Sequence, residues 1–351
     1  MKSNFKQIAG MTILSAVLVS PSFATDVNFH GFIRSFYDTS SSTAKYIGLI
    51  DDNGSWGGTQ AGLNYSTKIN SQLSIAGQLH YNVGEGELNL DWGFATFSPN
   101  NSSKIQFGKQ KYPLGLITES IDVGISYPWV RPPQEMYHLE LSDESPNFAL
   151  ESYDGLSAIY TTGDDWEFIV QPFIGQYNYK ESSTTTIRKM SGLKLELSSE
   201  ILTLQAGLSS SKLTIAGGPT DQTRKTVNIG AKVEIDNFLS YIEFIDVEVD
   251  NSDTFDSNAG YVTFAYTFDS LQPSITFAQL EGQKTAGAAT GSLDQKSTAV
   301  ALAYTFNPST VFKMQWKNIK PDDPTTGGLI GALPAGETSA DIFSFTMDVV
   351  F

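Results

Sequence analysis

The sequence contains no cysteine among its 351 residues. This absence excludes a disulfide framework, a thiolate metal site and a catalytic thiol. Basic side chains are also scarce, with 22 Lys and Arg against 38 Asp and Glu, so the formal charge is 22 − 38 = −16. A nucleic-acid-binding protein needs a basic footprint, and this balance argues against one.

Long apolar runs are missing after the first two dozen residues. In segment 1–24, Lys2 and Lys6 precede a mostly apolar stretch, 8–19, and Ser22-Phe23-Ala24 forms a small-x-small cleavage site. This pattern predicts a secretory signal peptide that is removed after Ala24, which leaves residues 25–351 as the mature chain. The alternative, a membrane-spanning helix, needs about 20 apolar residues, more than this stretch offers.

Charged residues make up 17% of the chain and aromatic residues 12%, which favours a β-rich protein. Segments 73–81 and 343–351 alternate apolar and polar side chains, as do many others. Because successive side chains of a strand point to opposite faces, each segment predicts a strand with one apolar face. Sixteen strands are expected to begin near Val27, Gly57, Leu73, Leu88, Lys104, Ser152, Trp166, Ile187, Leu202, Arg224, Phe238, Ala259, Leu271, Gln295, Thr310 and Ala340.

The connections between these strands tend to alternate between short turns and long loops. The long ones are 39–56, 110–151, 212–223, 251–258, 282–294 and 320–339. Short turns at one end and long loops at the other are typical of outer-membrane barrels. The fold class is therefore predicted to be all-β, a transmembrane antiparallel β-barrel of about sixteen strands.

The alternatives to this barrel are a soluble β-sandwich and a β-solenoid. A sandwich would bury the apolar faces against each other, whereas a membrane barrel turns them outward to lipid around a polar lumen. Leu63, Leu79, Phe264 and Phe345 test the choice, because packing of these four inside a closed interior would contradict the barrel. Aromatic residues gather at expected strand ends, as in the girdles of membrane barrels; they are Tyr65, Tyr81, Tyr160, Phe268, Phe306 and Trp316.

Three segments resemble the trimeric general porins of Gram-negative outer membranes. Segment 27–32 looks like their first strand, and 94–97 with 105–110 resembles the strand pair before their constriction loop, with Lys109 in place of the usual Arg. The terminal Phe351 is similar to their C-terminal assembly signal. The resemblance implies a sixteen-stranded barrel, a homotrimer and a third external loop that folds into the lumen.

The connection 110–151 is the candidate constriction loop. Its acidic candidates for pore lining are Glu119, Asp122, Glu135, Glu140, Asp143 and Glu144. The basic candidates are Arg131 on the loop and Arg34, Lys109, Lys194 and Lys232 on the facing wall. Acids and bases on opposite sides would create a transverse field, and rings of charge select ions. Alternatively, Arg34 pairs with Asp38, Lys109 holds the loop root, and the last three acids lie in external solvent.

These features predict a passive channel for small hydrophilic solutes and ions in the outer membrane of a Gram-negative bacterium, with a preference for cations. The alternative within this class is a channel selective for a sugar, a dicarboxylate or a peptide-like solute. An outer-membrane lipase is not favoured, because the sequence has no Gly-x-Ser-x-Gly motif. No cofactor is expected. The expected partners are outer-membrane lipid and lipopolysaccharide, and Asp250, Asp253 and Asp256 are candidates for a divalent cation.

Overall fold

The computed structural model describes residues 27–84, 86–137, 151–178, 185–215, 220–250, 256–282 and 294–351. The predicted signal peptide, residues 1–24, lies outside them. The strands are β1 (Val27–Ser40), β2 (Gln60–Lys68), β3 (Leu73–Asn82), β4 (Glu87–Asn100), β5 (Ser103–Lys111), β6 (Ser152–Thr162), β7 (Glu167–Asn178), β8 (Thr185–Ser198), β9 (Leu202–Ile215), β10 (Gln222–Ile235), β11 (Phe238–Val249), β12 (Ser257–Tyr266), β13 (Leu271–Glu281), β14 (Gln295–Asn307), β15 (Thr310–Pro321) and β16 (Ala340–Val350).

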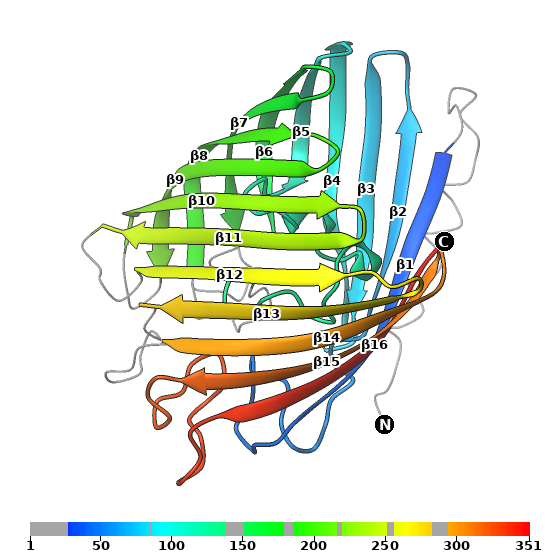
Figure 1. The fold of residues 1–351 in the computed structure, drawn as a ribbon. Helices are drawn as coiled ribbons and strands as arrows, with labels where there is room; N and C mark the ends of the chain where they lie inside the picture. Colours follow the sequence, from blue (N-terminus) through cyan, green and yellow to red (C-terminus); the bar gives the residue numbers. More distant parts are fainter. Residues whose placement is uncertain are drawn as a thin grey trace, which may run out of the picture.

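The sixteen strands form one closed antiparallel barrel, in which each strand pairs with its neighbours in sequence and β1 pairs with β16 (Figure 1). The predicted fold class is confirmed, and the predicted strand starts agree within a few residues. Closure satisfies the backbone groups of every strand edge, as hydrocarbon requires. At the seam, Gly31 and Phe351 exchange two backbone hydrogen bonds of 2.9 and 3.0 Å. The Phe351 ring lies where a side chain at position 31 would be, so a larger residue there would have to displace the ring.

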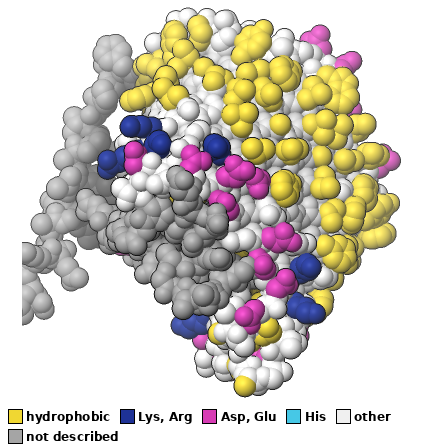
Figure 2. All heavy atoms as spheres, turned by 90° about the vertical axis from the view of Figure 1, so that its left-hand side faces the viewer, with side chains coloured by type: hydrophobic (Ala, Val, Ile, Leu, Met, Phe, Trp, Pro, Cys, Tyr) yellow, Lys and Arg dark blue, Asp and Glu magenta, His cyan; other side chains and the backbone are white. Residues whose placement is uncertain are grey.

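Apolar side chains cover the outside of the barrel. Leu63, Leu79, Phe264 and Phe345 are between 37% and 48% exposed, so they do not pack into a closed interior. Figure 2, which views the end with the long connections, shows hydrophobic side chains along the flank and charged side chains gathered near the mouth. This distribution is that of a transmembrane barrel.

Five strand pairs contain a register shift. The shift between β3 and β4 bears on the lumen: Leu79 pairs with Leu90, whereas Gln78 pairs with Trp92, so Asp91 is the extra residue of a β-bulge. In such a bulge two residues oppose one, and the bulged side chains are re-aimed. Asp91 and Trp92 therefore both face the lumen with Gln78.

Two short 3₁₀ helices, η1 (Thr118–Ser120) and η2 (Gly124–Ser126), lie on the connection between β5 and β6. No helix in the described parts of the chain is long and apolar enough to span a membrane.

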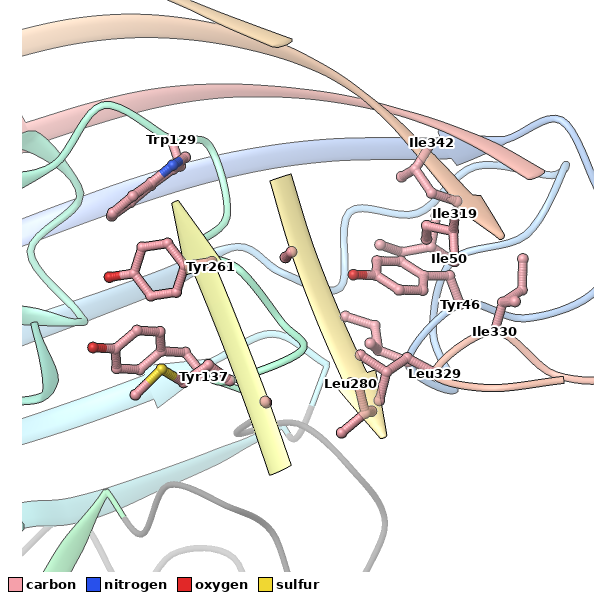
Figure 3. Close-up of a cluster of buried hydrophobic side chains, with 14 of the residues drawn as sticks. Tyr46, Ile50, Trp129, Tyr137, Tyr261, Leu280, Ile319, Leu329, Ile330 and Ile342 are labelled. Atoms are coloured by element: carbon pink, nitrogen blue, oxygen red, sulfur yellow. The ribbon is translucent and has the colours of Figure 1, made fainter. Parts of the chain in front are cut away.

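The larger buried apolar cluster lies inside the barrel, between the wall and the loops. Figure 3 shows two groups within it, one around Trp129, Tyr137 and Tyr261, the other around Tyr46 and Ile330. Trp129 and Tyr137 come from the β5–β6 connection, and Tyr46 comes from the connection between β1 and β2. Loop residues thus supply the apolar surface that covers this part of the inner wall.

Candidate functional site

The connection between β5 and β6, called here the third loop, spans residues 112–151, of which the structure describes 112–137 and Glu151. It folds inward and follows the wall from β9 to β16 and β1. Tyr112 and Ser209 of β9 share a hydrogen bond of 2.7 Å, and the Leu116 backbone N–H donates to Glu243 of β11 at 2.8 Å. Further along, the Val130 N–H donates to Gln315 of β15 at 3.0 Å. The expected inward fold is thus present in the described part of the loop.

Trp129 anchors the middle of the third loop. Its indole N–H donates to the hydroxyl oxygens of Thr276 and Thr263, at 2.8 and 3.1 Å, and its ring packs beside Tyr241 and Tyr261. Figure 3 shows the indole close to Tyr261. A buried Trp needs such a partner for its N–H. The two threonines belong to β12 and β13, so this contact holds the loop against that part of the wall.

A buried ion cluster fixes the loop against β1, β15 and β16. Asp348 forms salt bridges with Arg34, at 2.9 Å, and with Lys313, at 3.3 Å. Lys313 also donates to three carbonyls of the loop, those of Gly124, of Tyr127 at 2.7 Å and of Trp129 at 3.0 Å. Arg34 donates to the Tyr127 hydroxyl at 2.6 Å and to the Val130 carbonyl at 2.9 Å. Two wall cations therefore satisfy the loop backbone through η2 and the residues after it.

Two more buried ion pairs follow along the loop. Arg131 pairs with Asp38 of β1 at 2.9 Å. Glu135 pairs with Lys317 of β15 at 2.9 Å, and Lys317 also donates to the Tyr46 hydroxyl at 3.0 Å. Burial by itself would raise the pKa of Glu135, but the charge and hydrogen bond of Lys317, together with a hydrogen bond from Ser297, hold this pKa below its ordinary value.

At the loop root, one ammonium lies among three carboxylates. Lys111 at the end of β5 contacts Glu151 at 2.6 Å, Asp122 at 2.7 Å and Asp91 at 2.9 Å. Burial by itself would raise the pKa of Asp122, but Lys111, together with His80 and the Gln78 amide, keeps this pKa well below the ordinary range. Burial, helped by the charges of Asp122 and Asp91, raises the pKa of Glu151 to about 8 against the opposing pull of Lys111. These three acids form a group with metal-ligand spacing in the described residues, and the Lys111 ammonium already sits within hydrogen-bond distance of all three.

Among the described carboxylates of the third loop, Glu119 is the most exposed. Its side chain is 60% exposed, and it lies 3.4 Å from Lys194 of β8, which is 8% exposed and also pairs with Glu196 at 3.1 Å. Lys232 of β10 pairs with Glu234 at 2.7 Å. The strand register places Lys194 and Lys232 on the inner face, opposite Gln171 and Tyr241.

Two sequence-based assignments are wrong in this structure. Arg34 is paired with Asp348, because Asp38 is taken by Arg131. Lys109 does not line the lumen: it lies on the same outward face as Phe107, which is 69% exposed, and its ammonium donates to the Leu90 carbonyl beside the β-bulge at 2.8 Å. Regular alternation with Phe107 accounts for this orientation, and the cation that lies at the loop root is Lys111.

Some of the predicted site residues cannot be placed, and others have local partners. Glu140, Asp143, Glu144 and Asp253 lie outside the described residues. Asp250 lies 3.5 Å from Lys225, and Asp256 accepts the Val249 backbone N–H at 2.6 Å. These two aspartates therefore serve an exposed ion pair and a hairpin connection.

Sequence reasoning missed the roles of Lys111, Lys313, Lys317 and Asp348. Period-two alternation puts Lys313 and Lys317 on the face opposite Phe312 and Trp316, so the sequence alone could predict that both face the lumen. It could not predict their partners on the loop, because these lie more than 180 residues away along the chain.

The fold is that of known outer-membrane proteins, although no protein-family model and no curated protein sequence matches the chain. OmpT of Vibrio cholerae with loop L8 deleted is 16% identical over 94% of this chain and 100% of its own, with a TM-score of 0.61. Salmonella typhi OmpF, solved with daunomycin, is 17% identical over 93% of this chain and 97% of its own, with a TM-score of 0.62. An anion-selective porin from Comamonas acidovorans is 12% identical over 93% of this chain and 99% of its own, with a TM-score of 0.64. At these identities the likeness shows the fold alone.

Proposed function

We propose that the protein is a porin-like channel of a Gram-negative outer membrane, through which small hydrophilic solutes and ions diffuse passively. The observation that carries this is the third loop, which lies inside a closed barrel and is held to the inner wall by ion pairs. An inward loop narrows a lumen without catalysis, and its side chains then sort solutes by width and charge. Solved porins with the same fold support the same reading.

The setting of the channel is part of this proposal. The apolar outer flank suits lipid, and lipopolysaccharide is the expected lipid of the outer leaflet. Assembly as a homotrimer rests on the resemblance of segments 27–32 and 105–110 to the trimeric general porins. Chemical cross-linking of the purified protein tests it: a ladder that ends at three copies supports the trimer, and one that ends elsewhere contradicts it.

The proposed ion preference is for cations. In the described part of the loop, Asp122 and Glu135 are buried against Lys111 and Lys317, whereas Glu119 is exposed and its partner Lys194 is buried. A mobile ion beside the loop therefore meets a carboxylate before it meets an ammonium. The fold itself does not set the sign, since one solved neighbour is an anion-selective porin.

Planar-bilayer recording tests both statements. We expect stepwise conductance in KCl and a reversal potential, under a salt gradient, that favours K⁺. Glu119→Gln should move the reversal potential toward anions. The control is Glu200→Gln, which removes an exposed carboxylate from a short turn and should leave the reversal potential unchanged. A folded, inserted protein without conductance steps would contradict the channel, and an unchanged reversal potential in Glu119→Gln would contradict the role of Glu119.

A further inference from the structure

The wall opposite the main loop anchors carries a pair of aromatic side chains. Trp92 and Phe94 of β4 have ring centroids 5.5 Å apart and planes inclined by 29°, a stacked arrangement. The register pairs them with Gln78 and Ala76 of β3, on the inner face. Both are half-buried, whereas the inward rings of Trp129, Tyr153 and Phe173 are buried under neighbours.

The β-bulge at Asp91 produces this orientation. Without the extra residue, the strand from Leu90 onward would keep its alternation, and the residue after Asp91 would face outward with Leu90. The bulge instead brings Asp91 and Trp92 to the same side, opposite Gln78. Bulges are frequent beside functional sites because they re-aim side chains in this way. The backbone thus departs from its regular pattern at the point where an aromatic ring enters a polar lumen.

Small residues flank the second ring. Phe94 pairs with Ala76 on one side and with Gly108 of β5 on the other. Gly108 has φ of +135°, a conformation that side-chain-bearing residues rarely adopt, and an added Cβ would overlap the backbone of Gly93. Position 108 therefore stays without a side chain beside Phe94.

Neutral hydrogen-bonding side chains surround the rings. His80 and Asn89 are paired across β3 and β4, and Thr96 and Gln106 are paired across β4 and β5, all on the inner face and all half-buried. Amides, imidazole and hydroxyl groups can each donate and accept, which matches the hydroxyl groups of a polyol. Two carboxylates of the described residues, Asp91 and Asp122, lie beside Gln78, and both are paired with Lys111. The Gln78 amide also donates to Asp91 at 2.7 Å and to Asp122 at 3.0 Å.

We propose that Trp92 and Phe94 form a subsite for a sugar ring inside the channel. The weakly positive C–H face of a pyranose stacks on the negative face of an aromatic ring, while the neighbouring amide and hydroxyl side chains bind its rim of hydroxyl groups. The proposal rests on the proposed channel function and names a solute class for it: neutral oligosaccharides. Among the described residues, the carboxylates Asp91 and Asp122 are paired with Lys111 and about nine-tenths buried, which favours a neutral solute over an organic cation.

The test is the block of ion current by a sugar. Maltose added to wild-type channels in a planar bilayer should reduce the KCl conductance in a saturable way, and sorbitol, which has hydroxyl groups but no ring face, should not. Trp92→Leu and Phe94→Leu keep apolar bulk but remove the π face, so each should raise the half-blocking maltose concentration by about 3- to 10-fold. Trp92→Phe should retain most of the wild-type block.

Phe97→Leu is the matched control, since Phe97 lies on the same strand but on the outer face, where it is 43% exposed. Its half-blocking concentration should equal that of the wild type. Heat-modifiable migration and normal KCl conductance confirm that each variant is folded before sugar is added.

The outcomes separate the two proposals. Normal KCl conductance with no block by maltose, or with an equal block in Trp92→Leu and wild type, overturns the sugar subsite and leaves the channel standing. A block by arginine at lower concentration than maltose, relieved by Trp92→Leu, overturns the sugar assignment in favour of an organic cation. Absence of any KCl conductance overturns the channel itself, and the subsite with it.

Discussion

The inner wall of this barrel has two unlike halves. From β9 through β16 to β1 it is covered by the third loop, and its charged side chains Arg34, Lys313 and Lys317 are buried. From β2 to β5 the described loop segment touches it mainly at the root, and His80, Trp92 and Phe94 remain half-buried. One half thus determines where the loop lies, and the other half presents side chains to the lumen.

The difference shows what positions a long polar loop. An unpaired buried charge is strongly destabilising, so a charged wall accepts only a loop arrangement that supplies its counter-ions and acceptors. Lys313 finds three carbonyls and Asp348, and Lys317 finds Glu135. Because each match involves a different loop residue, sliding the loop by one position would break several at once. The half from β2 to β5 makes such a demand at Asp91, which Lys111 meets at the loop root, and it also carries neutral polar and aromatic groups such as Trp92 and Phe94.

The largest expected effect comes from breaking the covered half at Lys313. Lys313→Met removes the ammonium that donates to three loop carbonyls, and these carbonyls stay buried without a donor. We therefore expect a loss of about 3 kcal/mol in the free energy of unfolding. The freed loop should also add fluctuations to the open-channel current. Heat-modifiable migration and single-channel recording measure the two effects.

Lys320→Met is the matched control for that change. Lys320 lies on the same strand but is exposed on the outer face, so its loss should leave both readouts near wild type. Equal behaviour of the two variants would show that the loop is held by other contacts.

A smaller effect is expected from steric crowding between the wall and the loop. Gly207 of β9 faces Leu114, and a Cβ there would overlap the leucine side chain. Gly207→Val should cost about 1–3 kcal/mol through overpacking. It should also shift single-channel conductance, because the loop must move. Ala206→Val, next to it on the exposed outer face, changes the same strand without touching the loop. A conductance change in both variants would place its origin in the strand rather than in the contact.

Most of the fold was predictable, for a local reason. Period-two alternation is a property of each strand alone, so the number of strands, their starts and the outward face of residues such as Leu79 and Phe345 follow from short windows of sequence. Lys109 was misassigned against this pattern, since it alternates in phase with Ile105 and Phe107, whose side chains face outward, and is therefore expected on the outer face too.

The candidate site was predictable only in part. The length of the third loop and its content of proline and acids indicated its importance, but not which acids are neutralised. Asp122 and Glu135 look like Glu119 in sequence. They differ because Lys111 and Lys317 reach them in space, and that depends on the path of the whole loop across the barrel.

The smallest expected effect sharpens the comparison at the loop root, where the two halves meet. The pKa of Glu151 is raised to about 8, above its ordinary value, because burial and two neighbouring acids disfavour its charge. The stabilising contribution of this proton is therefore full below the ordinary pKa and is lost as the pH rises through about 8. Over the same range a negative charge appears beside the constriction, so cation preference should increase between pH 6 and pH 9. The change should be smaller than that from Glu119→Gln, since the Glu151 side chain is 29% exposed and that of Glu119 60%.

Reversal potentials at low salt, where screening is weakest, measure this change in cation preference. Glu151→Gln should flatten the pH dependence, Glu200→Gln should preserve it, and a wild-type selectivity that stays constant from pH 6 to pH 9 would mean that Glu151 is already ionised at neutral pH.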